Sequence, residues 1–403
     1  MRTGTSIGPV RRVDVLVVGA GPAGSAAAYR LADAGASVLL VDKARFPRDK
    51  PCGGGVTLRA ARQLPFAIDP VVEDVVDTFE LRLRYGSAFE RDGSGPLCYM
   101  TQRKRLDSFL AERAAEAGAE FRDGVRVDLD DNGAARVGGE RIRADAIVGA
   151  DGVNGVTSRA LGCDHGHGVA LEGNLPYGHI DRARYAGRLV LELGVVPGGY
   201  GWVFPKGDHV NFGVGGWESE GPRLRAHLRR LCEAHDVEAA ELVDLRGYRL
   251  PFRRAGSSMQ KNKVLLVGDA AGLVDPLSGD GMYEAFVSAR LAADGILGGE
   301  EREYTDRVER ELTPLHTAGW AAKRALDRFP RLTFGLARIP LAWPVVARIV
   351  RGELRDPAEA RGLGRVPLRA LDALGLEVSA AKPPTPGRET GSPSAPLGRG
   401  AGA

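Results

Sequence analysis

The segment Gly19–Gly24 reads GAGPAG and is the first part of this 403-residue sequence whose residue types and spacing suggest a chemical task. It directly follows the apolar run Val13–Val18. Glycines at these spacings allow a tight turn after a strand and a close approach of the backbone to a phosphate, which the positive end of a following helix attracts. Asp42 stands 18 residues after Gly24, where a carboxylate can accept hydrogen bonds from ribose hydroxyls. We therefore expect a dinucleotide site here.

A cysteine and a row of aromatic residues are the second group whose side chains could take part in chemistry. Cys52 lies in the glycine-rich segment Pro51–Gly55, where a thiol either fills space as a small apolar group or takes part in the chemistry. Tyr200, Trp202 and Phe204 alternate along one segment, so in a strand their three rings lie on the same face. Such a face is either the core of a sandwich or the apolar wall of a substrate site.

The hydrophobic pattern predicts the elements that position these residues. Val13–Val18 and Ser37–Val41 are typical of buried strands, and the alanine-rich segment Ala23–Ala34 between them is typical of a helix, which makes one βαβ unit. An amphipathic helix is predicted at Leu106–Ala117 and a further strand at Ala144–Gly149.

Between about residues 170 and 255 the pattern changes to alternating β-type segments, which indicates an antiparallel sheet. The clearest of these segments are Arg188–Leu193, Gly201–Phe204 and His209–Val214. A buried strand returns at Val264–Val267, followed by a helix at Gly281–Ala293, so the second domain is predicted to be inserted into the first. Helices are predicted from about residue 300 to 375.

The composition excludes several classes of protein. Fifty-five glycines suit a fibrous or disordered chain, but 43% hydrophobic and 27% charged residues argue against both. The net charge of +3 is too small a basic excess for a nucleic-acid surface, so we predict no nucleic-acid partner. Four widely spaced cysteines favour reduced thiols, and His165 and His167 are expected in a surface loop, so no metal site is predicted.

Two later segments point to FAD. Asp151-Gly152 resembles the aspartate-glycine motif of the para-hydroxybenzoate hydroxylase-like flavoprotein superfamily. Gly268-Asp269 resembles the second FAD motif of that superfamily, whose aspartate binds the ribityl or ribose part of FAD. Arg103 matches the arginine of the superfamily's Arg-x-x-Phe/Leu-Asp helix start, which also lies along FAD. The resemblance implies that FAD is the cofactor.

Three further segments narrow the resemblance to the geranylgeranyl reductase family, over roughly residues 12 to 300. Phe46–Gly55 resembles that family's Pro-Cys-Gly segment, and Tyr200–Lys206 resembles its Tyr-x-Trp-x-Phe-Pro motif. Pro276–Ala285 is similar to the family's Pro-x-x-Gly-Glu-Gly-Ile-Tyr-Tyr-Ala run. In this last segment a turn beneath the flavin leads into a helix whose dipole stabilises negative charge on reduced flavin.

The resemblance, together with the motifs, implies a set of site residues. The expected cofactor-binding residues are Gly19, Gly21, Ala23, Gly24, Asp42, Lys43, Cys52, Gly53, Gly54, Arg103, Asp151, Gly152, Gly268, Asp269, Pro276, Gly279, Asp280, Gly281 and Met282. The expected substrate-binding residues are Tyr200, Trp202, Phe204 and Pro205, and the expected catalytic residues are Cys52, Tyr200 and Trp202. The role expected for Cys52 is either to shape the site or to relay a proton.

We predict an α/β fold with a Rossmann-like FAD-binding domain of the para-hydroxybenzoate hydroxylase type, an inserted, mostly antiparallel β substrate domain, and C-terminal helices. The FAD-binding domain is predicted at residues 1–78, 101–168 and 256–300, and the substrate domain at 79–100 and 169–255. The helical region is predicted at 301–378, and a disordered tail, rich in proline and glycine, at 379–403.

The activity that the resemblance implies is saturation of C=C bonds in a prenyl chain, such as a geranylgeranyl group or a related isoprenoid or quinone tail, by hydride transfer from reduced flavin. Such a reaction belongs to lipid metabolism, and its substrate is an apolar small molecule. Two alternatives stay open: an FAD-dependent monooxygenase, epoxidase or halogenase acting on a hydrophobic molecule, and a non-catalytic FAD redox sensor or lipid-binding protein.

The expected partners are a prenyl-type substrate and an electron donor, either NAD(P)H, a ferredoxin or a reduced quinone. We expect a monomer. We expect it in the cytoplasm, because the first apolar run leads straight into the glycine turn and gives no signal peptide. The apolar stretch 336–350 contains two arginines and two prolines, so it is not expected to cross a bilayer as a simple helix. Residues from about 316 to 353 are instead candidates for peripheral contact with the inner face of the membrane.

Overall fold

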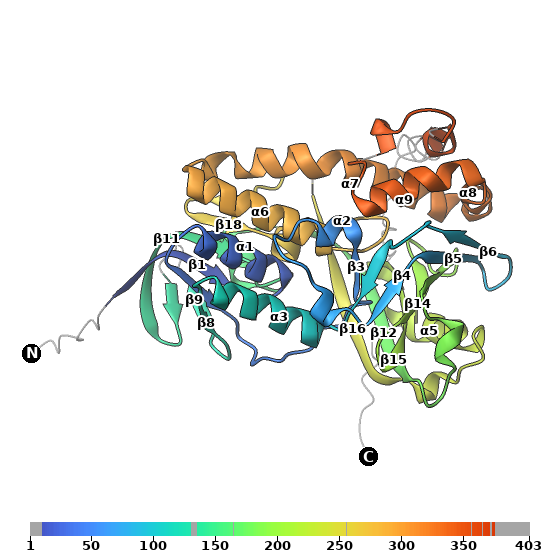
Figure 1. Ribbon diagram of the computed structural model, residues 1–403, viewed down its shortest axis with the longest axis horizontal. Coiled ribbons are helices and arrows are strands. Elements are labelled where there is room, and N and C mark those ends of the chain that lie inside the picture. The colour runs from blue at the N-terminus through green and yellow to red at the C-terminus, as the bar shows by residue number, and fades with distance from the viewer. Residues whose placement is uncertain are drawn as a thin grey trace, which may run out of the picture.

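The computed structural model, shown in Figure 1, describes residues 10–129, 135–163, 165–254, 256–355, 357–364, 366–370 and 373–374. The predicted disordered tail at 379–403 lies outside the described residues. The described part of the chain contains two large sheets, a small three-stranded sheet, helices packed on them and a layer of C-terminal helices.

The first sheet contains the predicted βαβ unit. β1 (Arg11–Val18) pairs in parallel with β2 (Val38–Val41) on one side and with β11 (Glu140–Gly149) on the other. β1 ends in a run of buried apolar residues because neighbouring strands and helices cover it. The strand order is β17-β18-β11-β1-β2-β8, and β9 and β10 extend it beside β11. These strands are β8 (Glu120–Arg122), β9 (Val127–Leu129), β10 (Ala135–Val137), β17 (Gln260–Lys261) and β18 (Val264–Leu266).

Three helices that are distant in sequence pack together beside this sheet. α1 (Pro22–Asp33) contacts both α3 (Arg103–Glu116) and α6 (Met282–Gly298), and Figure 1 shows the three side by side. The late strand β18 pairs in parallel with β11. The chain therefore returns to its first sheet after building the second, as the sequence predicts.

The second sheet has the order β16-β12-β15-β14-β13-β5-β6 and is antiparallel except where β13 pairs in parallel with β5. Its strands are β5 (Thr78–Leu83), β6 (Ala88–Asp92), β12 (His165–Pro176), β13 (Arg188–Leu193), β14 (Tyr200–Pro205), β15 (His209–Trp217) and β16 (Val243–Arg253). α5 (Leu224–Glu233) packs on β15 and closes a core that includes Val203, Phe212 and Leu228. The inserted, mostly antiparallel sheet is confirmed.

Shorter elements connect these bodies. A small sheet joins β3 (Gly55–Thr57), β7 (Cys98–Met100) and β4 (Asp74–Val76), and it carries α2 (Leu58–Ala61). α4 (Val156–Leu161) follows β11. The short 3-10 helices are η1 (Asp69–Val71), η2 (Arg182–Arg184), η3 (Glu218–Arg223), η4 (Ala239–Glu241), η5 (Gly268–Ala271), η6 (Glu301–Glu303), η7 (Pro340–Ala342) and η8 (Pro357–Glu359).

The C-terminal helices α7 (Tyr304–Arg328), α8 (Pro330–Ala337) and α9 (Trp343–Arg351) lie along the top of the view in Figure 1. α7 packs on α6, and α9 packs on α2. Within the described residues no single helix is long and apolar enough to cross a membrane. The bent pair Pro330–Ala337 and Pro340–Arg351, with 69° between its halves, meets the length and composition criteria only when the two are taken together.

One prediction about local structure is wrong, and two predicted domain boundaries fall inside elements. His165 is buried in β12 instead of lying in a surface loop, because β12 pairs with β15 and β16 at the same time. The predicted boundary between residues 78 and 79 lies within β5, and the one between residues 168 and 169 lies within β12. The division of the chain into domains stays a prediction.

Candidate active site

A cavity of about 930 Å³ lies between the two sheets. It is lined by the loops that follow β1, β2, β11 and β18 and by side chains of β12, β14 and β16. Because the carboxyl ends of parallel strands meet at one edge of a sheet, the motifs that follow these strands come together there. The volume is at the upper end of the range for small-molecule sites.

The glycine turn after β1 fits a phosphate. Gly19 has a φ of +101°, and a Cβ added there would lie 2.4 Å from the carbonyl oxygen of Ala150. A Cβ added at Gly24 would lie 1.8 Å from the carbonyl oxygen of Gly19. α1 then begins with Pro22, and its N-cap residue Gly21 has no side chain to cap the first amides. These amides are free to bind the pyrophosphate of a dinucleotide.

Asp42 holds the turn from the end of β2. Its carboxylate accepts hydrogen bonds from the backbone N of Ala20, at 2.9 Å, and of Ala44, at 2.8 Å. The residue is only 8% exposed and lines the cavity. The carboxylate is therefore fixed at the sheet edge where the sequence predicts a ribose.

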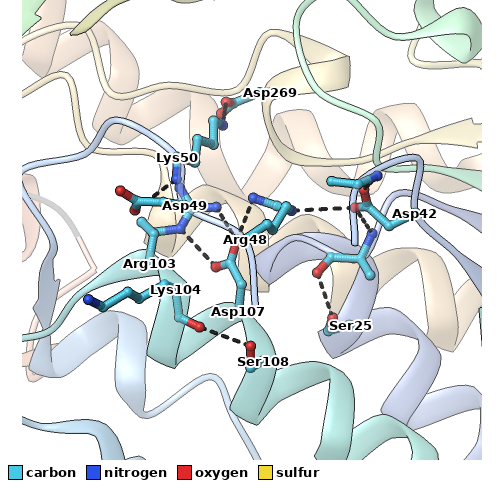
Figure 2. Close-up of polar contacts among 12 residues, drawn as sticks. Ser25, Asp42, Arg48, Asp49, Lys50, Arg103, Lys104, Asp107, Ser108 and Asp269 are labelled. Carbon is cyan, nitrogen blue, oxygen red and sulfur yellow. Dashed lines mark hydrogen bonds and ion pairs between the residues drawn. The ribbon is translucent and has the colours of Figure 1, made fainter. Parts of the chain in front are cut away.

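Two guanidinium groups lie against the glycine turn, and the sequence analysis identified only one of them. Arg103, the first residue of α3, donates two 2.8 Å hydrogen bonds to Asp107. Arg48 lies between Asp42 and Asp107, as Figure 2 shows, with Nη1 2.9 Å from Asp107 Oδ2 and Nε 3.7 Å from Asp42 Oδ2. A Cβ added at Gly21 would lie 3.3 Å from Nη2 of Arg48 and 3.9 Å from Nη2 of Arg103. Both cations therefore reach the turn that suits a pyrophosphate.

Asp269 is held by two residues that the sequence analysis did not select. Lys50 Nζ and the Tyr248 hydroxyl donate hydrogen bonds of 2.8 and 2.7 Å to Asp269 Oδ2. Lys50 Nζ also lies 4.4 Å from the centroid of the Tyr248 ring. Burial alone raises the pKa of Asp269, but Lys50 and Tyr248 outweigh burial and hold it below its usual value. Asp269 is therefore ionised at neutral pH.

Asp151 binds its own loop. Its carboxylate accepts hydrogen bonds from the backbone N of Val156, at 2.6 Å, and of Thr157, at 3.1 Å, and from the Thr157 hydroxyl. It thereby fixes the start of α4 and the left-handed turn at Gly152, whose φ is +78°. Both residues line the cavity.

Tyr200, Trp202 and Phe204 form a continuous aromatic wall on one face of β14. Neighbouring ring centroids are 6.1 and 6.2 Å apart, and all three rings line the cavity. Trp202 Nε1 donates a 2.8 Å hydrogen bond to Asn211, and the Tyr200 hydroxyl donates one to the carbonyl of Ser278. The wall is thereby joined to the loop that precedes α6.

The loop that carries Cys52 packs on this wall. A Cβ added at Gly53 would lie 2.9 Å from the Phe204 ring. Gly54 N donates a 3.3 Å hydrogen bond to Cys52 Sγ, and Cys52 N donates a 2.7 Å bond to Glu172. Lys206, also outside the selected set, is buried and donates hydrogen bonds to the carbonyls of Thr101 and Gly53. Burial lowers the pKa of Lys206 and raises that of Glu172.

Most residues selected from the sequence line this one cavity, including Lys43, Pro276, Gly279, Asp280, Gly281 and Met282. Three do not: Gly24 and Gly268 lie behind the cavity surface, and Pro205 follows Phe204 and so points to the other face of β14. Arg48, Lys50, Glu172 and Tyr248 line the cavity but were not selected. Arg48 and Lys50 carried a usable signal, since both stand in the segment that leads into Pro51–Gly53.

Comparison with known proteins gives concordant results. Residues 12–176 match the family model of an FAD binding domain. The chain is 31% identical over 388 residues to a menaquinone reductase of Mycolicibacterium smegmatis, covering 88% of this chain and 95% of that protein. It is 30% identical over 347 residues to a chloroplastic geranylgeranyl diphosphate reductase of Oryza sativa subsp. japonica, covering 79% of this chain and 74% of that protein.

A third relative, a digeranylgeranylglycerophospholipid reductase of Methanopyrus kandleri, is 30% identical over 380 residues, covering 84% of this chain and 93% of that protein. Among solved structures, a geranylgeranyl bacteriochlorophyll reductase-like protein from Thermoplasma acidophilum superposes with a TM-score of 0.72 at 23% identity. The superposition covers 86% of this chain and 98% of that one. At that identity the structural likeness supports the fold alone.

Proposed function

The chain belongs to the geranylgeranyl reductase family of FAD-dependent oxidoreductases, and from this premise we propose that it saturates C=C bonds of a prenyl chain. The observation that carries the proposal is the shared cavity: the aromatic wall of Tyr200, Trp202 and Phe204 lines the same space as the glycine turn and Asp269. An apolar chain on this wall lies next to the residues that bind the cofactor.

Bound FAD in its reduced form supplies the hydride for one carbon of the double bond. The residues of this chain bind and orient the two reactants. The glycine turn, Arg48 and Arg103 hold the pyrophosphate, and Asp42 accepts hydrogen bonds from the ribose. The start of α6 would supply the positive end of a helix dipole to negative charge on the reduced ring.

The remaining lining favours an isoprenoid over a polar substrate. Beyond the aromatic wall the cavity continues along Val346, Ile349 and Val350 of α9. Branched apolar side chains and rings exclude water from the double bond, so water does not react with the hydride in place of the substrate. Which prenyl compound binds depends on its head group, for which a membrane lipid, a menaquinone and a diphosphate are the candidates.

We extend the proposal to partners and location. The electron donor is NAD(P)H, a ferredoxin or a reduced quinone, and the enzyme acts as a monomer in the cytoplasm, at the inner face of the membrane. Exposed apolar side chains on α8 and the segments after it support membrane contact, and α9 beside them lines the cavity. These side chains are Leu332, Ile339, Leu341, Leu363 and Val366. Sedimentation with anionic liposomes tests the contact, and full recovery in the supernatant would contradict it.

The decisive experiment is anaerobic incubation of the dithionite-reduced holoenzyme with geranylgeranyl diphosphate, a menaquinone and a geranylgeranylated glycerolipid. We expect mass spectrometry to find a gain of two hydrogens per double bond in one of them, without oxygen. A product that forms only with oxygen uptake would instead indicate a monooxygenase or halogenase. Flavin that cycles with no product from any substrate would indicate a redox sensor.

A further inference from the structure

A carboxyl group without an obvious structural task lines the cavity at the start of α6. Asp280 Oδ1 accepts a 2.9 Å hydrogen bond from the backbone N of Met282. Asp280 Oδ2 is buried and has no hydrogen-bond partner in the part of the chain that the structure describes. Asp280 N donates to the Ser278 hydroxyl at 3.2 Å, and the Ser278 carbonyl accepts from Tyr200. The carboxyl group therefore belongs to the loop that meets the aromatic wall.

A second acid, Glu284, stands four residues after Asp280 and lies beside a histidine. Glu284, in the first turn of α6, is fully buried, and neither of its carboxyl oxygens has a hydrogen-bond partner among the residues described. His316 of α7 places Nε2 3.5 Å from Glu284 Oε1, and the side chain of His316 is 18% exposed. Glu284 is thus a buried acid whose charge acts on Asp280, with a partly exposed imidazole beside it.

Two neighbouring carboxyl groups in an apolar surrounding do not readily ionise together. The charged and titratable groups that act on Asp280 come from several elements: Glu284 on α6, Arg59 on α2, Asp275 in the same loop, Tyr200 on β14 and Cys98 on β7. Burial, followed by the charge of Glu284, raises the pKa of Asp280 to about 7, although Met282 N and Arg59 oppose the shift. An acid of this strength is partly protonated at neutral pH and suits general acid catalysis.

We propose that Asp280 donates the proton that completes saturation of the double bond. This rests on the proposed function. Reduced FAD gives a hydride to one alkene carbon and is oxidised by two electrons, while the proton of Asp280 passes to the other carbon. The π bond breaks and two C–H bonds form. The resulting Asp280 carboxylate takes up a proton from solvent through the cavity that it lines.

Other donors in the cavity are less suitable. The hydroxyl of Tyr200 already donates to the Ser278 carbonyl, and burial raises its pKa well above its usual value. Lys323 already donates to the carbonyl of Gly198 and lies over the rings of Trp217 and Phe252. Cys52 remains as a competitor, since its thiol accepts a hydrogen bond from Gly54 N and has its own proton to give.

The test uses the holoenzyme of Asp280→Asn, Asp280→Glu and Asp294→Asn, the last a matched control on the exposed face of α6. With pre-reduced enzyme and a single turnover, we expect Asp280→Asn to lower the rate of saturation about 100-fold with unchanged substrate affinity and FAD content. Asp280→Glu should restore much of the rate. The wild-type rate should fall as the pH rises through about 7, because the proton is then lost from Asp280, and Asp280→Asn should not show this dependence.

A second readout does not depend on turnover. Infrared difference spectra of the wild type between pH 6 and 8 should contain the carbonyl band of a protonated carboxyl group, and Asp280→Asn should lack it. Glu284→Gln should move the fall of the single-turnover rate to a lower pH than in the wild type, because the charge of Glu284 no longer raises the pKa of Asp280.

If the wild type saturates its substrate and Asp280→Asn keeps the same rate and pH dependence, the role of Asp280 is overturned. The proposed function then still stands. If Cys52→Ala then abolishes proton delivery, the thiol is the donor. A wild type that forms no saturated product overturns the proposed function, and this role with it.

Discussion

Lys50, in the loop after β2, donates a 2.8 Å hydrogen bond within an ion pair to Asp269 of η5, 219 residues away in sequence. Asp269 belongs to the second FAD motif, and the loop of Lys50 also carries Cys52. One contact thus joins the segment that packs on the aromatic wall to the edge of the parallel sheet.

Replacing Lys50 with methionine should destabilise the protein by about 2 kcal/mol at pH 7, because Asp269 would keep only the Tyr248 hydroxyl as a partner. In the wild type the pKa of Asp269 is lowered, so its stabilising effect is present above the unfolded value of about 4 and is lost as the pH falls below it. The difference between wild type and variant should therefore shrink below pH 4. Urea unfolding of the apoprotein at pH 7, 5 and 3.5 measures this.

Lys104→Met is the matched control for that measurement, because Lys104 lies nearby in Figure 2 but is exposed on α3. It should unfold like the wild type at each pH. A Lys50→Met variant with a constant deficit at every pH would mean that the ion pair does not hold Asp269 in its charged form.

Gly24→Ala should abolish retention of FAD during purification. The added Cβ would lie 1.8 Å from the Gly19 carbonyl oxygen and would push α1 away from the turn that binds the pyrophosphate. Gly21→Ala should be milder, with about a tenfold loss of FAD affinity, since its Cβ meets only the ends of the Arg48 and Arg103 side chains, at 3.3 and 3.9 Å. Flavin absorbance per protein and fluorescence titration with FAD measure both effects.

Gly335→Ala on α8 is the control, because a Cβ there meets nothing within 4 Å. It should keep the full flavin content. An equal loss of FAD binding in Gly21→Ala and Gly24→Ala would argue against the different roles given to these two glycines.

The sequence predicted the elements of this site better than the contacts within it. The first strand, helix and strand follow from apolar periodicity and glycine spacing, which are local properties, and so does the shared face of Tyr200, Trp202 and Phe204. Arg48, Lys50 and Tyr248 were not selected because their partners lie on other elements, and only the fold brings them together. His165 was misassigned for the same reason: the polar, glycine-rich stretch around it suggests a loop, but pairing of β12 on both edges makes a strand.

Trp202→Ala should raise the KM for the prenyl substrate at least about tenfold and leave FAD content unchanged, because Trp202 is the middle ring of the wall and contributes apolar area to the substrate. Trp202→Phe keeps an aromatic surface, so it should preserve most of the affinity. It should still lower stability by about 1 kcal/mol, since Asn211 loses the indole N–H at 2.8 Å. Steady-state kinetics and thermal unfolding separate the two effects, and an unchanged KM in Trp202→Ala would place the substrate elsewhere.

Cys52→Ser and Cys52→Ala distinguish a thiol that shapes the loop from one that moves a proton. The geometry favours shaping, because Cys52 Sγ accepts the Gly54 amide at 3.3 Å and a serine oxygen can accept the same hydrogen bond. Cys52→Ser should therefore keep full FAD content and turnover within about threefold of the wild type, whereas Cys52→Ala loses the acceptor and should weaken FAD binding by about 1 kcal/mol. If both variants bind FAD fully and both lose turnover about 100-fold, the thiol itself takes part in proton transfer. In that case the pH dependence assigned to Asp280 should also change in Cys52→Ser, since the two groups line one cavity.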